Sequence, residues 1–348
     1  MGQDGAHPNG SRPKAESNGH QNVGGYRLLR EIDTDSLGSV YEAEHPRLHR
    51  RVAVRTIGTG VARDVSFSRR FLLELRSYKA LEHEAIPKLY ELAYEGDSPY
   101  LVTELVAGVT LESHLGDGQR YEPLGVVSLL RPIADALDYA HSRATIHRDV
   151  KPANILLAQD GRTMLTGFGL GTVATFNTGP GANGPVAPDY VAPERLVGRE
   201  VDGRADVYSL AAVIFEATTG SRPFSSKSWI ETLSRRLYEP PPNVREVAPD
   251  LSPAFAAVLQ LAMDRDPNRR PATAGELLDR LESAISSPNG KAEGVRRFIK
   301  PPTIRARGSI GVGAALVVII GAAEIVWLFE GAGLRHLQQV LHRWLGAG

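Results

Sequence analysis

One short stretch of the chain holds the side chain types that transfer a phosphoryl group. It reads His147-Arg148-Asp149, and Lys151 and Asn154 follow it closely. In such a loop the Asp accepts the proton of a substrate hydroxyl, the Lys steadies the transferring phosphate, and the Asn binds a metal ion. The stretch therefore predicts a phosphoryl-transfer site, with Asp149 and Lys151 as catalytic residues and Asn154 as a metal ligand.

The apolar pattern around this loop predicts the elements that position it. Short β-rich runs come first, at residues 26–32, 39–44, 51–57, 89–94 and 100–104. Helical patterns dominate afterwards, at residues 124–143, 206–220, 253–264 and 273–283. Because the strands are segregated from the helices, the sequence predicts an α+β protein with a smaller sheet lobe and a larger helical lobe.

Motifs on both sides of the loop indicate a known family. Residues 52–55 (VAVR) lie where that family has a Val-Ala-Ile-Lys strand, residues 192–194 read Ala-Pro-Glu, and residues 266–271 read DPNRRP. With the loop at residues 146–156, the chain resembles the eukaryotic-like Ser/Thr protein kinases of bacteria over about residues 26–281. The resemblance implies a bilobal protein-kinase fold. Many family members carry a cytosolic kinase domain followed by one membrane span.

The resemblance also implies a nucleotide site and several structural residues. The positions that match nucleotide-binding residues of the family are Gly38, Val40, Ala53, Arg55, Glu104, Val106 and Leu156. Glu74 matches the helix Glu that pairs with the strand Lys, so an Arg55–Glu74 pair is one way to hold that helix. Glu194 and Arg270 match a buried ion pair of the larger lobe.

Two of the departures from the family pattern affect the phosphate-binding residues. The loop that covers the phosphates has Asp33 and Asp35 where the family has its first two glycines, and keeps only Gly38. Carboxylates there add bulk and negative charge beside a polyanion, although Asp tolerates turns and lets the hairpin survive. The strand Lys is Arg55, which exchanges a compact ammonium for a wide planar fork.

Two further departures affect the metal and the catalytic Asp. Gly167 replaces the metal-binding Asp of the family's Asp-Phe-Gly, which leaves Asn154 as the remaining family-type ligand. Residues 186–187 (Val-Ala) replace a Gly-Thr pair. Losing one preorganised electrostatic contact costs about 10²–10³ in rate. The changes together therefore predict a loss of at least ~10⁴.

Two interpretations of the function remain. The leading one is a catalytically impaired pseudokinase, a signalling scaffold or regulator that binds ATP weakly, makes doubtful use of Mg²⁺, and recruits kinases, substrates or phosphatases. The alternative is an active Ser/Thr kinase with an unconventional metal site, because Asp149, Lys151 and Asn154 are intact. In that case Asp33 or Asp35 supplies the missing carboxylate.

Composition excludes several other classes of protein. Lys plus Arg and Asp plus Glu both number 40, so the zero net charge gives no support to a nucleic-acid partner. With no cysteine, the chain has no disulfide, Cys-ligated zinc or thiol nucleophile.

The flanking segments predict a membrane anchor. The expected organisation is a disordered leader at 1–24, a kinase-like domain at 25–284, a basic juxtamembrane linker at 285–308, a transmembrane helix at 310–329 and a short tail at 330–348. The 20-residue apolar segment would extend about 30 Å as a helix, the thickness of a bilayer core. Basic residues gather before it, so the expected topology is single-pass, with the kinase-like domain cytoplasmic and the tail outside.

Overall fold

The structure is a computed structural model that describes residues 22–35, 37–58, 65–116, 119–171, 189–226 and 229–286. The span expected at residues 310–329, with the linker before it and the tail after it, lies outside these ranges, as does most of the expected leader. Within the described ranges, no helix is both long enough and apolar enough to cross a bilayer.

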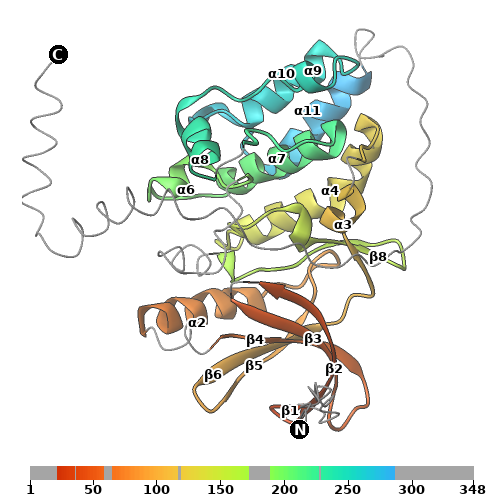
Figure 1. The fold of residues 1–348 in the computed structure, drawn as a ribbon, viewed down its shortest axis with the longest axis vertical. Helices are drawn as coiled ribbons and strands as arrows, with labels where there is room; N and C mark the ends of the chain where they lie inside the picture. The colour runs from red at the N-terminus through yellow and green to blue at the C-terminus, as the bar shows by residue number, and fades with distance from the viewer. Residues whose placement is uncertain are drawn as a thin grey trace, which may run out of the picture. The chain divides into compact units, whose positions relative to one another are not determined.

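The N-terminal part is a six-stranded antiparallel sheet in the order β1-β2-β3-β4-β6-β5 (Figure 1). Its strands are β1 (Asn22–Val23), β2 (Tyr26–Asp35), β3 (Gly38–Glu44), β4 (Arg51–Thr56), β5 (Leu89–Glu95) and β6 (Ser98–Glu104). Helix α2 (Val65–Lys79) lies beside this sheet and contributes Phe71, Leu75 and Tyr78 to the main apolar core. Alternating apolar residues such as Val52 and Val54 bury one face of the sheet in a second, smaller cluster.

The hairpin between β2 and β3 extends farther than the sequence pattern predicts. The predicted first strand ends at residue 32, but pairing continues to Asp35, which lies opposite Gly38. The strand tolerates Asp at this end because the Asp35 carboxylate accepts hydrogen bonds from two backbone N–H groups of its own turn.

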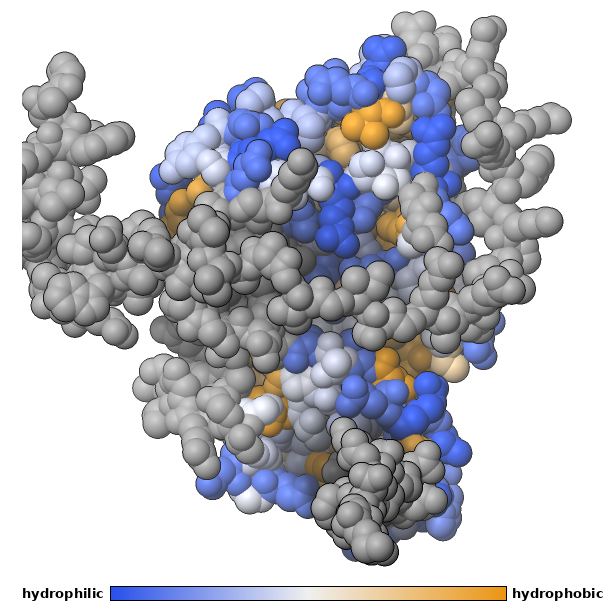
Figure 2. Space-filling view, viewed as in Figure 1, coloured by the Kyte–Doolittle hydropathy of each residue, from blue (hydrophilic) through white to orange (hydrophobic). Residues whose placement is uncertain are grey.

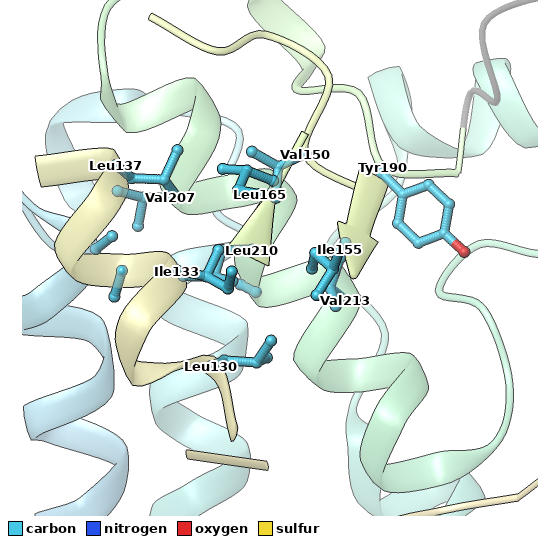
Figure 3. Packing of buried hydrophobic residues seen from close by; sticks show 14 of the residues in the cluster. Leu130, Ile133, Leu137, Val150, Ile155, Leu165, Tyr190, Val207, Leu210 and Val213 are labelled. Atoms are coloured by element: carbon cyan, nitrogen blue, oxygen red, sulfur yellow. The ribbon is translucent and has the colours of Figure 1, made fainter. Parts of the chain in front are cut away.

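The helical part is built around α4 (Pro123–His141) and α7 (Arg204–Thr219). Figure 3 shows Ile133 and Leu137 of α4 beside Val207 and Leu210 of α7. Nearly every residue of α7 is buried, so this helix is the centre of the core rather than an amphipathic surface helix. The other elements of this part are α3 (Leu111–Leu115), α6 (Pro193–Leu196), α8 (Trp229–Tyr238), α9 (Val244–Val247), α10 (Pro253–Ala262), η3 (Pro267–Arg269) and α11 (Ala274–Ser286).

A second, three-stranded sheet supports the loop that contains Asp149. It consists of β7 (Gly108–Thr110), β8 (Ile155–Ala158) and β9 (Thr163–Leu165), and the short helix η2 (Pro152–Asn154) leads into β8. Val150, Ile155 and Leu165 are buried in the core around α4 and α7 (Figure 3). These apolar residues hold the polar residues between them, Lys151 and Asn154, in place.

The division into a sheet-rich and a helical part confirms the predicted α+β class.

The space-filling view shows a largely hydrophilic surface on the face it presents, with scattered hydrophobic residues (Figure 2). Exposed large apolar side chains include Leu48, Leu124 and Tyr238, which come from separate parts of the chain. Isolated apolar residues of this kind are ordinary on a protein surface and do not indicate a binding site.

Candidate catalytic and nucleotide site

Asp149 contacts both of the other residues predicted for the phosphoryl-transfer loop, Lys151 through an ion pair and Asn154 through hydrogen bonds. The Nζ atom of Lys151 lies 2.8 Å from Oδ2 of Asp149. The amide of Asn154 donates to the same Oδ2 at 2.9 Å and to the carbonyl oxygen of Asp149 at 2.7 Å. Asn154 therefore uses its NH₂ group on Asp149, and its carbonyl oxygen is the atom suited to bind a metal ion.

A buried carboxylate holds the backbone of this loop. Asp206 at the start of α7 is fully buried, and it accepts the N–H groups of His147 and Arg148 at 2.8 Å each. Arg148 has φ of 66°, in the left-handed region that costs energy for a side chain other than glycine. The ring of His141 lies 2.8 Å from the same carboxylate. Asp206 thus stabilises a strained turn directly before Asp149, the predicted catalytic residue.

The His141–Asp206 contact has the charges of an ion pair. Burial by itself raises the pKa of Asp206, but the hydrogen bond and charge of His141 outweigh it and bring the pKa below the usual value. Burial also acts to lower the pKa of His141, but the Asp206 carboxylate reverses this and raises it. Both directions favour a protonated imidazole beside a charged carboxylate.

A stack of three rings connects α2 to the catalytic loop. Phe168 stacks on Tyr78 at 5.9 Å between ring centroids and meets His147 edge-on at 4.5 Å. His147 belongs to the predicted phosphoryl-transfer loop, and Phe168 follows Gly167 in the stretch that matches the family's Asp-Phe-Gly, but Tyr78 was not predicted. The sequence feature that could have indicated Tyr78 is its position four residues, or one helical turn, after Glu74. Burial lowers the pKa of His147, so its ring is neutral at pH 7.

The pairing of Glu74 and Arg55 differs from the predicted one. Glu74 accepts a hydrogen bond from Arg148 at 2.9 Å, and Arg55 donates to Asp35, also at 2.9 Å. No Arg55–Glu74 pair occurs among the residues that the structure describes. The reason is local: the hairpin end places a carboxylate beside Arg55.

The residues predicted to bind a nucleotide come from both sheets. Val40 of β3 lies opposite Arg55 of β4, and Ala53 lies opposite Thr103 of β6. Leu156 is in β8 of the second sheet. Three further positions were predicted, and they lie at turns or strand ends: Gly38, Glu104 and Val106.

The backbone after β6 includes an N–H group that is available to a base. The Glu104 carboxylate lies 3.3 Å from the Arg162 side chain. The backbone N–H of Glu104 donates to the carbonyl oxygen of Lys88. Within the described residues, the N–H of Val106 has no hydrogen-bond acceptor. An adenine ring presents acceptor nitrogens that such an N–H can meet.

The predicted metal position has lost one ligand. Gly167 has φ of 90°, and a Cβ placed on it would lie 3.1 Å from Nδ2 and 3.5 Å from Oδ1 of Asn154. A carboxylate at residue 167 would therefore lie beside Asn154. Across the described ranges, no three or more His, Cys, Asp or Glu side chains are grouped to hold a metal ion. Gly167 thus offers no side chain to a metal ion beside Asn154.

The ion pair expected between Glu194 and Arg270 is present. Both nitrogens of the Arg270 fork donate to the Glu194 carboxylate at 2.7 Å, and both side chains are buried. The next residue, Arg195, is also buried and donates to the carbonyl oxygens of Arg148 and Gly171. Sequence reasoning missed Arg195, since nothing in its spacing distinguishes it from a surface arginine.

Comparison with known proteins identifies the family. A model of the protein kinase domain matches residues 26–280. The chain is 35% identical to the serine/threonine-protein kinase PknJ of Mycobacterium tuberculosis over 269 residues, which cover 75% of this chain and 45% of PknJ. It is 30% identical to PrkC of Bacillus subtilis over 265 residues, which cover 76% of this chain and 41% of PrkC. The chain thus spans less than half the length of these two relatives.

A solved structure gives the same result. The crystal structure of the Mycobacterium tuberculosis PknI kinase domain matches with a TM-score of 0.64 and 28% identity, covering 77% of this chain and 98% of that one. Kinase membership implies the use of ATP, usually with Mg²⁺, so the comparisons give no support to the doubt about Mg²⁺. With the bilobal fold and a family model that covers most of its length, this chain belongs to the protein kinase family and is similar to bacterial Ser/Thr kinases.

Proposed function

We propose that this chain is a catalytically impaired member of the kinase family that acts as a signalling scaffold or regulator. The observation that carries the proposal is Gly167, which places no carboxylate beside Asn154. In the family a metal ion at that place bridges the phosphates and neutralises the charge that develops during transfer. Without that ligand, Asp149 and Lys151 have lost the partner that makes phosphoryl transfer fast.

The test is phosphoryl transfer by the purified full chain. Labelled ATP is supplied with Mg²⁺ or Mn²⁺ and a mixed set of Ser/Thr peptides, beside an Asp149→Asn control. We expect the wild-type chain and the control to transfer label at the same background rate. Transfer that is present in the wild-type chain and absent from the control would overturn the impaired state.

We also propose that the site keeps a nucleotide-binding role without chemistry. Support comes from the stack of Tyr78, Phe168 and His147, which is assembled although the metal-binding Asp is absent. The N–H of Val106 adds a donor for a base. Thermal unfolding of the full chain with millimolar adenine nucleotide, with and without Mg²⁺, measures this role. We expect a small stabilisation that does not depend on the metal.

An active Ser/Thr kinase is the second candidate function. It is favoured by the contacts of Asp149 with Lys151 and Asn154, which are complete. Asp149 would then accept the proton of a Ser or Thr hydroxyl in the protein substrate. The hydroxyl oxygen would bond to the γ-phosphorus of ATP as the bond from that phosphorus to the ADP oxygen breaks. The phosphoryl-transfer assay above separates the two candidates.

Membrane anchoring and protein partners complete the proposal. The apolar segment at residues 310–329 and the basic residues before it support a single span with the kinase domain in the cytoplasm. The proposed partners are other kinases, their substrates or phosphatases. Fractionation of cells that express the full chain, beside a variant without residues 310–329, tests the anchor. Recovery of both from the soluble fraction would refute it.

A further inference from the structure

The Asp35 carboxylate takes up the donors that line one end of the nucleotide site. Its Oδ2 accepts a hydrogen bond from Arg55 at 2.9 Å. Its Oδ1 accepts the backbone N–H groups of Leu37 at 2.9 Å and of Gly38 at 3.2 Å. The Asp35 side chain is therefore the hydrogen-bond acceptor for one cation, Arg55, and for two backbone N–H groups of the phosphate-covering loop.

The backbone around Asp35 is held against the end of β4, so the position of the Asp35 carboxylate is fixed by a packed loop. Leu37 is only 4% exposed and belongs to the main apolar core, together with Ile57. The N–H of Gly58 donates to the carbonyl oxygen of Leu37 at 2.8 Å. A Cβ added to Gly38 would lie 2.0 Å from the carbonyl oxygen of Thr56, so the loop backbone lies close against the end of β4. Lifting the loop would expose Leu37 to water.

Backbone N–H groups and a nearby cation are the means by which proteins bind phosphate. Here a carboxylate already satisfies them and brings its own negative charge. A phosphate group entering the same space would have to displace that carboxylate or lie beside it, and like charges close together are unfavourable.

We propose that Asp35 is a built-in anion that fills the phosphate end of the site, so that the site binds an uncharged adenine nucleoside at least as tightly as ATP. This inference builds on the nucleotide-binding role proposed above, but it does not depend on loss of phosphoryl transfer. Adenine contacts at Ala53, Leu156 and Val106 would stay available, while the phosphates would gain no donors.

Calorimetric titration of the full chain with adenosine and with ATP, without Mg²⁺, tests the inference. For the wild-type chain we expect the dissociation constant for adenosine to be equal to or lower than that for ATP. Asp35→Asn and Asp35→Gly should each tighten ATP binding by about 10-fold or more and change adenosine binding by less than about 3-fold. Asp35→Asn keeps the size of the side chain, and Asp35→Gly restores the family's residue.

Asp97→Asn is the control. Asp97 is an exposed aspartate in the turn between β5 and β6, outside the phosphate-covering loop. This variant removes the same charge from the same sheet without changing the partner of Arg55. We expect its ATP affinity to remain within about 3-fold of the wild-type value.

Three results would overturn the inference. They are ATP binding about 10-fold tighter than adenosine binding in the wild-type chain, unchanged ATP affinity in both Asp35 variants, and no adenosine binding at all. If neither variant folds, the wild-type ratio of the two affinities still decides. Phosphoryl transfer by the wild-type chain would refute the impaired state and leave this ratio unaffected.

Discussion

Arg148, directly before the predicted catalytic residue Asp149, donates a hydrogen bond to Glu74 of α2 at 2.9 Å. The two residues are 74 positions apart in the sequence, and each side chain is about a quarter exposed or less. The contact joins α2 to the catalytic loop directly. In the family such a glutamate pairs with the strand lysine, whereas here the corresponding Arg55 is bonded to Asp35.

The Glu74–Arg148 pair should show measurable coupling. A double-mutant cycle with Glu74→Gln and Arg148→Gln is expected to give an interaction free energy of about 1 kcal/mol, because the pair is partly shielded from water. The measurement is urea unfolding of the four proteins at one pH. A coupling indistinguishable from zero would show that the contact does not stabilise the placement of α2.

Loss of the buried Arg270 should be far more damaging. Arg270→Met leaves the Glu194 carboxylate buried without its bidentate partner, and we expect the free energy of unfolding to fall by about 3–5 kcal/mol. The control is Arg269→Met. The Arg269 side chain is 67% exposed and forms a surface pair with Asp264 at 3.1 Å. That change should cost about 1 kcal/mol or less. Equal losses in the two variants would contradict the importance of the buried pair.

Gly167→Asp should make ATP binding more responsive to metal ions than it is in the wild-type chain. The new carboxylate would start beside Asn154, so ATP binding is expected to become tighter on addition of Mg²⁺ or Mn²⁺. The variant places a side chain at φ of 90°, which costs about 1–2 kcal/mol in stability.

Gly161→Asp is the control for that strain. Gly161 has φ of 89°, and a Cβ on it would have no neighbour within 4 Å. Its stability loss should match that of Gly167→Asp, but without a metal response. The prediction fails if Mg²⁺ has the same effect on ATP binding in both variants.

The buried His141–Asp206 pair predicts a specific pH dependence of stability. The pKa of His141 is raised above 6.5, so its stabilising contribution is complete below pH 6.5 and is lost as the pH rises through the folded-state pKa. The pKa of Asp206 is lowered below 3.8, so its contribution is present above pH 3.8 and is lost as the pH falls through the folded-state value.

Comparison of the wild-type chain with His141→Asn isolates the contribution of His141 to the free energy of unfolding. The difference in free energy of unfolding should be larger at pH 5.5 than at pH 9, because only the protonated ring forms the ion pair. Asp206 stays ionised in the folded chain over this range, so it does not mask the change. A difference that is the same at both pH values would show that His141 is bound in its neutral form.

The sequence by itself determined the local parts of the site and the class of the fold. Asp149, Lys151 and Asn154 lie within six residues, so one short turn is enough to bring them into contact. The strands and helices followed from periodicity, because burial of one face imposes a period of two or 3.6 residues. The Glu194–Arg270 pair, 76 residues apart, came only from resemblance to a family, since spacing alone does not indicate it.

Only the tertiary structure decided which distant charges pair. The sequence suggested an Arg55–Glu74 pair, whereas in the structure Arg55 pairs with Asp35 and Glu74 with Arg148. The choice depends on how the hairpin end meets β4 and how α2 meets the catalytic loop. The attraction between two charges falls with the distance between them and rises with their burial. Distance and burial both depend on how residues far apart in the chain pack together. For the same reason the sequence predicted Asp35 as a defect of the phosphate loop, whereas the folded chain shows it bonded to Arg55 and two backbone donors of that loop.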